Sequence, residues 1–216
     1  MNDKKRMVVI LKSLGSEFKP WRRFTDDPFL ALVSTVLSQN TNWRNTRTAY
    51  ERLTSKFRTP RQIAVADERE IQELIRPAGL HRIKSKRLRE LSQAICERYG
   101  GNIRHVLKKP LAEARQELLS LPGVGYKTAD VVLAFSAGRD VLPVDTHIFR
   151  ISKRLGFAAP KDNHEKVRIK IEALVPVGRR GEAHMLLIQH GRRYCRAIRP
   201  LCVECPVSNY CPKIGV

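Results

Sequence analysis

One short stretch, residues 121–130 with the sequence Leu-Pro-Gly-Val-Gly-Tyr-Lys-Thr-Ala-Asp, constrains the fold more than any other part of the chain. Pro122 ends the preceding helix, because its ring clashes with the carbonyl four residues back and it has no N–H to donate. Gly123 and Gly125 permit the positive φ angles of a tight turn. Apolar residues return at helical spacing from Ala129 to Phe135, which predicts that a second helix follows directly.

A glycine turn that opens a helix leaves backbone N–H groups without partners, next to the positive end of the helix dipole. Such a turn suits a phosphate group. We therefore expect Leu121, Gly123, Val124 and Gly125 to form a phosphate contact. The alternative is a plain connector between two helices, which a lone Gly-x-Gly would favour.

Nearly every other segment also predicts helix, and no stretch gives a convincing period-two alternation. Asp27 followed by Pro28 is typical of an N-cap with proline at the first helical position. Asp67 with Glu70 has the form of a capping box. We expect an all-α fold.

The chain carries a large excess of positive charge, with 41 Lys and Arg against 21 Asp and Glu. This excess points to a polyanion as partner, whereas a merely charged, thermophile-like surface predicts matched signs. The basic segment 81–89 includes Lys84 and Lys86, which we expect to contact phosphate; a solvated helix face is the alternative. The early apolar run at residues 7–11 is too short for a signal peptide or membrane span, so we expect an intracellular protein.

Two residues downstream of the glycine turn carry candidate chemistry. Lys127 falls in the first turn of its helix, where the dipole disfavours a cation and lowers the lysine pKa, as a nucleophilic amine requires. Asp145 reads as an N-cap, which holds an ionised carboxylate in place and suits it to stabilise developing positive charge. A surface lysine on phosphate and a purely structural cap are the alternatives. Asp130 is a lesser candidate, because a helix-surface ion pair with Lys127 explains it.

Four of the five cysteines lie near the C-terminus, at Cys195, Cys202, Cys205 and Cys211. Four thiolates in one loop suit either a [4Fe–4S] cluster or a tetrahedral zinc ion. Zinc ribbons usually pair two Cys-x2-Cys knuckles and this loop has one, so the spacing mildly favours iron–sulfur. A redox role and a structural role both remain open at this point.

The hairpin sequence followed by Val-Asp-Thr-His-Ile-Phe-Arg resembles the endonuclease III family of helix-hairpin-helix DNA glycosylase/AP lyases. The resemblance implies a six-helix lobe at 29–137 and a second helical lobe from 1–28 with 138–216. It also implies a substrate cleft between the lobes and a [4Fe–4S] cluster in the loop 195–211. The cysteine spacing matches the family pattern without a gap.

The resemblance further implies that Lys127 is the nucleophile and Asp145 its essential carboxylate. A damaged nucleotide is flipped out, the amine attacks C1′, and β-elimination of the Schiff base nicks the strand. The family places a glutamine in the turn after the first core helix, where an ungapped comparison puts Asn40, with Gln39 one residue earlier. Either residue is a candidate to fill the gap left by the flipped base.

We expect a monomer that removes oxidised pyrimidines from double-stranded DNA, or cuts at abasic sites, in a prokaryotic cytoplasm rather than in a nucleus. One alternative is a mismatch glycosylase for uracil, thymine or adenine, although such relatives generally lack an amine at the position of Lys127. The other is a non-catalytic DNA-binding protein with an iron–sulfur cluster.

Overall fold

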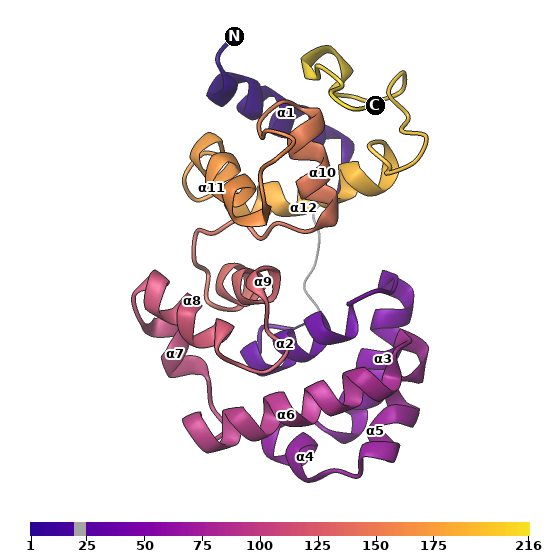
Figure 1. The fold of residues 1–216 in the computed structure, drawn as a ribbon, viewed down its shortest axis with the longest axis vertical. Helices are drawn as coiled ribbons and strands as arrows, with labels where there is room; N and C mark the ends of the chain where they lie inside the picture. Colours follow the sequence, from indigo (N-terminus) through magenta and orange to yellow (C-terminus); the bar gives the residue numbers. More distant parts are fainter. Residues whose placement is uncertain (20–24) are drawn as a thin grey trace. The chain divides into compact units, whose positions relative to one another are not determined.

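A computed structural model describes residues 1–19 and 25–216, and within those ranges the chain is helical with no strand. The all-α prediction is confirmed (Figure 1). The helices are α1 (Asp3–Glu17), α2 (Pro28–Leu37), α3 (Trp43–Lys56), α4 (Pro60–Val65), α5 (Glu68–Ile75), the 3₁₀ helix η1 (Arg76–Ala78), α6 (His81–Tyr99), α7 (Arg104–Lys108), α8 (Leu111–Leu119), α9 (Tyr126–Ser136), α10 (Thr146–Arg154), α11 (His164–Leu174), α12 (Arg180–Arg193) and the 3₁₀ helix η2 (Ser208–Tyr210). None of these helices combines the length and the apolar character needed to span a membrane.

The chain divides into two compact units. The discontinuous unit consists of Met1–Arg22 and Asp140–Val216, and the central unit of Arg23–Arg139. Residues 20–24, which the expected segment 1–28 includes, lie outside the described residues. In its described part the central unit has more α-helices than the expected six, because α4 and α7 are separate short helices of six and five residues.

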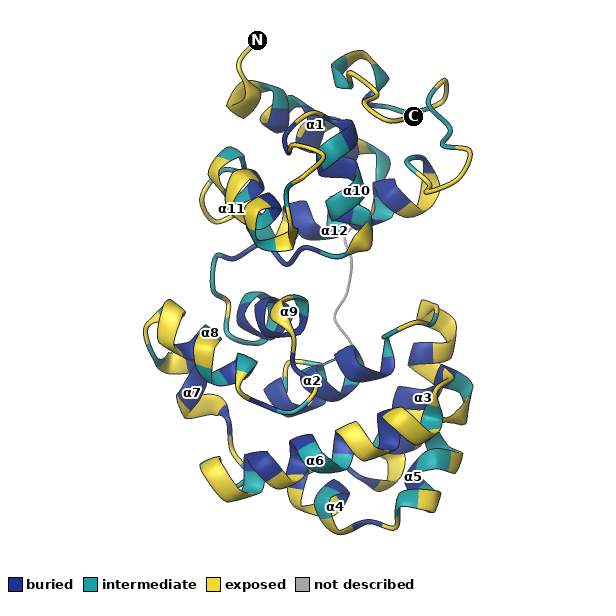
Figure 2. Ribbon diagram, viewed as in Figure 1, coloured by how far each residue is buried: buried dark blue, intermediate teal, exposed yellow. Residues whose placement is uncertain are grey.

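Helix α2 forms the centre of the central unit. It is buried on nearly all sides, including Leu32, Val36 and Leu37, and packs against α3, α6 and α9 (Figure 2). The predicted N-cap is confirmed, because Leu30 N–H donates to Asp27 Oδ1 at 3.0 Å. A cap of this kind stabilises a helix by about 1 kcal/mol.

The expected capping box lies one helix earlier than we predicted. Thr59 Oγ1 accepts from Gln62 N–H at 3.3 Å, and the Gln62 side chain accepts from Thr59 N–H at 3.1 Å. Asp67 instead caps α5 alone, by accepting from Arg69 N–H at 2.7 Å. Glu70 pairs with Lys56 of α3, so a tertiary contact takes the side chain that a box would use.

The discontinuous unit packs α1, α10, α11 and α12 around one apolar core. Gly191 lets α12 approach α10 closely, because a Cβ there would lie 2.8 Å from His147 Cβ and 2.9 Å from Ile151 Cδ1. The position of α10, which Asp145 caps, therefore depends on the absence of a side chain at residue 191.

Candidate active site

The glycine turn joins α8 to α9 as expected, but its two glycines serve different purposes. Gly123 has a φ of +73°, the left-handed region that favours glycine. Gly125 has a φ of −95° and is the N-cap of α9, so the positive φ that both glycines permit is adopted by Gly123 and not by Gly125. A Cβ at Gly125 would meet nothing within 4 Å, which leaves open space for an approaching ligand.

The turn presents two exposed glycines between buried side chains. Leu121 and Val124 bury their side chains, and Val124 N–H donates to Leu121 O at 3.2 Å. Neither residue therefore offers a side chain to DNA as it stands. Gly123 and Gly125 are exposed residues, and their N–H groups donate to no group among the described residues. Their amides are therefore candidates to bind an anion.

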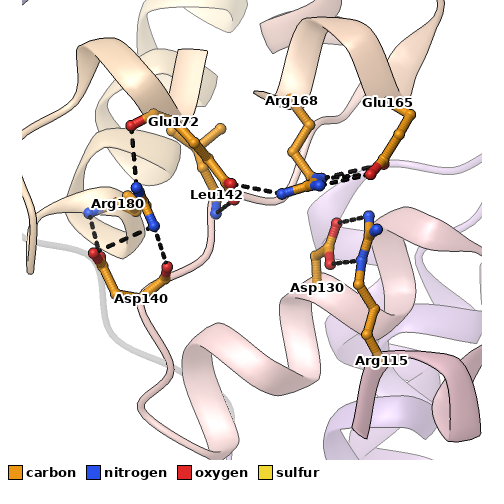
Figure 3. A network of polar contacts seen from close by, with 8 residues as sticks. All are labelled: Arg115, Asp130, Asp140, Leu142, Glu165, Arg168, Glu172 and Arg180. Carbon is orange, nitrogen blue, oxygen red and sulfur yellow. Dashed lines mark hydrogen bonds and ion pairs between the residues drawn. The ribbon is translucent and has the colours of Figure 1, made fainter. Parts of the chain in front are cut away.

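A paired carboxylate joins the two helices of the hairpin. Asp130 of α9 is 2% exposed, and it accepts from Arg115 of α8 through Nε at 2.8 Å and Nη2 at 3.1 Å (Figure 3). Asp130 is therefore buried and not the surface residue that we expected. Removing either partner of such a pair is strongly destabilising, because it leaves an uncompensated charge inside the protein.

Lys127 lies in the first turn of α9, two residues after the Gly125 cap, as predicted. It is half-buried, and the exposed Tyr126 ring beside it stacks under the guanidinium of Arg115 at 5.2 Å. The Arg115–Asp130 pair and this cation–π contact fix the start of α9, and with it the main chain that carries Lys127.

Asp145 is the N-cap of α10, as predicted, and accepts from Ile148 N–H through Oδ1 at 2.8 Å. The segment before it, residues 141–144, is buried, and side chains of two other helices bind its main chain. Leu142 N–H donates to Glu172 Oε1 at 2.8 Å (Figure 3), and His184 Nδ1–H donates to Pro143 O at 2.7 Å. Lys127 belongs to the central unit and Asp145 to the discontinuous unit.

The turn after α2 distinguishes the two candidate gap-filling residues. Asn40 is exposed and has a φ of +52°. Gln39 is half-buried, and its Oε1 accepts from Arg87 Nη1 at 2.9 Å. Asn40 is thus the residue that the turn presents to solvent, while Gln39 is tied to α6.

Our expectation that Lys84 contacts phosphate is wrong for the folded chain. Its side chain is 1% exposed, and Nζ donates to Leu37 O and Ala78 O, both at 2.8 Å. Burial, with a contribution from the charge of Arg87, lowers the pKa of Lys84 to about 8. Lys86 is exposed, as a phosphate contact requires, with Glu90 3.9 Å away.

The four cysteines of the C-terminal loop lie half-buried, and three of them, Cys195, Cys205 and Cys211, pack against the apolar core. Burial raises the pKa values of the Cys205 and Cys211 thiols, and the charges of the other loop cysteines add to the increase. Lys213 N–H donates to Cys211 Sγ at 3.3 Å. Among the described residues, no three His, Cys, Asp or Glu side chains are arranged to hold a single metal ion.

Two arginines that sequence reasoning missed organise this loop. Arg154 is 8% exposed and donates to Arg196 O at 2.5 Å and Ala197 O at 3.1 Å, with Nη1 3.5 Å from Cys195 Sγ. Arg150 donates to Cys195 O through Nε at 3.0 Å and Nη2 at 2.8 Å. The sequence carried a signal, because Ile151 and Arg154 are three residues apart and share the buried face of α10.

Comparisons with known proteins show which proteins the chain is similar to. Residues 33–177 match the HhH-GPD superfamily, described as base excision DNA repair proteins. The chain is 38% identical to endonuclease III of Thermotoga maritima, over 86% of this chain and 83% of that protein. It is 33% identical to thymine-DNA glycosylase of Aeropyrum pernix, over 96% and 92% respectively. Its structure matches a trapped covalent endonuclease III–DNA intermediate with a TM-score of 0.86 and 31% identity, over 99% of this chain and 97% of that one.

Proposed function

The chain belongs to the endonuclease III family of HhH-GPD base excision DNA repair proteins, and we propose that it is a DNA glycosylase with AP lyase activity on oxidised pyrimidines. The proposal depends above all on the position of Lys127. It lies in the first turn of α9, directly after a turn whose glycine N–H groups donate to no other group among the described residues. This places an amine next to a candidate phosphate-binding turn, as attack on the sugar of a bound nucleotide requires.

We assign the covalent step to Lys127. The amine lone pair forms a bond to C1′, and the base leaves with the electron pair of the glycosidic bond and a proton. Opening of the C1′–O4′ bond, in which O4′ keeps the bonding electron pair and takes up a proton from water, gives a protonated Schiff base. Loss of a C2′ proton then expels the 3′ phosphate oxygen, so that the strand is cut 3′ to the lesion. Hydrolysis releases Lys127 for the next turnover.

Asp145 supplies fixed negative charge to this reaction. Its Oδ1 accepts the Ile148 amide, so the carboxylate keeps one orientation while the glycosidic bond breaks. A pre-oriented anion stabilises oxocarbenium-like charge without reorganising during the reaction. The buried segment held by His184 and Glu172 supports that orientation.

The protein binds DNA through the phosphate groups of the DNA backbone, and these contacts do not depend on the base sequence. The Gly123 and Gly125 amides take one phosphate at the positive end of α9, and exposed basic residues such as Lys86 take others. Asn40, which is exposed, fills the space left by the flipped nucleotide rather than Gln39. Leu80 is a second exposed side chain of this kind, 50% exposed with a φ of +49°, and apolar residues insert between base steps in many minor-groove complexes.

Cys195, Cys202, Cys205 and Cys211 would hold a [4Fe–4S] cluster in the loop 195–211. Four thiolates can hold such a cluster without converging on one point as they do around zinc. With the cluster bound, the loop would be fixed and its basic residues would lie against DNA. The chain supplies hydrogen bonds toward the sulfurs from Lys213 N–H and Arg154, the kind of contact that tunes such a cluster.

Replacing Cys202 by serine should remove most of the bound iron and the broad visible absorption of the cluster. It should also weaken binding to undamaged duplex, because the loop loses its anchor. Iron and sulfide analysis with a visible spectrum measures the first effect, and fluorescence anisotropy the second. Replacing Cys96, which lies outside the loop on α6, is the matched control. Purified protein that carries one zinc and no sulfide would contradict the assignment.

The reaction is tested on duplexes that differ at one nucleotide. Wild-type protein should release a ring-saturated pyrimidine and nick the same strand, and should nick a preformed abasic site without added reagents. Base release without a nick, on a mismatched uracil or thymine, would instead support the mismatch glycosylase that the Aeropyrum relative suggests. We propose a monomer acting in the prokaryotic cytoplasm, and light scattering of the DNA complex should give one protein per duplex.

A further inference from the structure

The buried ammonium of Lys84 joins the ends of two helices. Its Nζ donates to Leu37 O, at the last residue of α2, and to Ala78 O, at the last residue of η1, both at 2.8 Å. A lysine ammonium has three N–H donors, and two of them are used here. Carbonyls at the C-terminal end of a helix have no hydrogen-bond donor within the helix. The Lys84 ammonium therefore supplies the missing donor to the ends of both α2 and η1.

Each of these carbonyls stands directly before an exposed turn. Asn40 follows Leu37 by three residues and has a φ of +52°; Leu80 follows Ala78 by two and has a φ of +49°. Only four non-glycine residues of the described chain have positive φ, and the other two, Arg199 and Lys213, belong to the C-terminal region. Such backbone strain persists only where the surroundings over-determine it, and it concentrates at functional sites.

Arg87, one helical turn after Lys84 on α6, extends the same contact to the glycine turn. Its Nη1 donates to Gln39 Oε1 at 2.9 Å. Its aliphatic stem lies beneath Gly123, where an added Cβ would touch Arg87 Cβ, Cγ and Cδ at 3.7 Å. Lys84 and Arg87 of α6 thus contact the residues that lead into the two turns, Leu37 and Ala78, together with Gln39 and the hairpin at Gly123.

We propose that Lys84 and Arg87 form a positioning pair, which holds the turns of Asn40 and Leu80 at a fixed spacing so that both side chains can enter the duplex when a base is flipped out. The inference rests on the proposed function. Pushing a nucleotide out of the stack costs free energy, and turns held in place beforehand lose no conformational freedom when they enter. At neutral pH Lys84 keeps its proton, because its pKa of about 8 still lies above the solution pH.

The ratio of base excision to abasic-site nicking in a Lys84→Met variant separates this role from general support of the fold. The two carbonyls lose their donor while most of the side-chain volume remains. We expect single-turnover excision of a ring-saturated pyrimidine to fall about 10-fold to 100-fold, as a misplacement of about 1 Å produces. Nicking of the same duplex with a preformed abasic site, which has no base to evict, should change by less than about 3-fold.

Arg87→Met serves where Lys84→Met is too unstable to assay, because Arg87 is exposed and its loss opens no cavity. It should lower the ratio of base excision to abasic-site nicking in the same direction. The loss of a phosphate contact would instead weaken all DNA equally and reduce the salt dependence of binding. Lys108→Met, at an exposed position of α7, is the control for the loss of one positive charge.

The outcomes separate the two proposals. An unchanged ratio in both variants, whether the rates are lost together or kept together, overturns the positioning pair. Wild-type protein that acts on neither substrate overturns the proposed function instead. A lowered ratio in either variant, with melting temperature above the assay temperature, supports the pair.

Discussion

Replacing Lys127 by alanine abolishes strand cleavage at an abasic site. We expect the single-turnover rate to fall by at least about 1,000-fold, since the variant lacks the amine to which we assign the Schiff base that β-elimination requires. Alanine is the best helix former, so α9 should stay intact and the protein should fold. Denaturing gel electrophoresis of an end-labelled abasic duplex measures the rate.

Binding of the variant to an abasic duplex should be nearly unchanged, because the Gly123 and Gly125 amides remain. Lys108→Ala on α7 removes the same charge from an exposed position and is the matched control. If Lys127→Ala still nicked the duplex at a rate near wild type, another nucleophile would be at work.

Replacing Asp145 by asparagine should remove activity without removing stability. Asparagine caps a helix about as well as aspartate, and its side-chain oxygen can accept the Ile148 amide in the same way. We expect the free energy of unfolding to change by less than about 0.5 kcal/mol. Base excision should fall by about 100-fold to 1,000-fold, the usual effect of removing one electrostatic contact to a transition state.

Asp145→Ala completes the comparison, because it removes both the charge and the cap and should cost about 1 kcal/mol of stability as well. Asp27→Asn, at the cap of α2, controls for the same exchange at another helix start. Chemical denaturation and a glycosylase assay on the four proteins measure both quantities. Full activity of the Asp145→Asn variant would show that Asp145 acts only as a helix cap and contributes no charge to the reaction.

The features that the sequence predicted correctly depend on residues that lie within a few positions of one another along the chain. Asp27 and Asp145 are caps because each is followed three residues later by the amide that it accepts. The start of α9 follows from glycines beside resumed helical spacing. Family membership and the all-α fold are confirmed for the same reason, since both depend on local motifs in a fixed order.

The features that sequence missed depend on partners far along the chain. Lys84 looked like part of a basic surface, but its acceptor at Leu37 lies 47 residues away. Asp130 forms an ion pair with Arg115 of the preceding helix, and Glu70 forms one with Lys56 of α3. One signal was present: Lys84 is four residues before Leu88 and seven before Leu91, on the buried face of α6. A lysine at a position that helical spacing assigns to the apolar face of a helix indicates a buried hydrogen-bond donor.

In the proposed reaction the Lys127 amine forms a covalent bond to the sugar of the target nucleotide. The most direct test is to react wild-type protein with abasic duplex in the presence of borohydride, which reduces a Schiff base to a stable amine, and to map the adduct by peptide mass spectrometry. We expect one cross-linked peptide, with the sugar remnant on Lys127. No adduct, or an adduct on a different lysine with Lys127 unmodified, would contradict it.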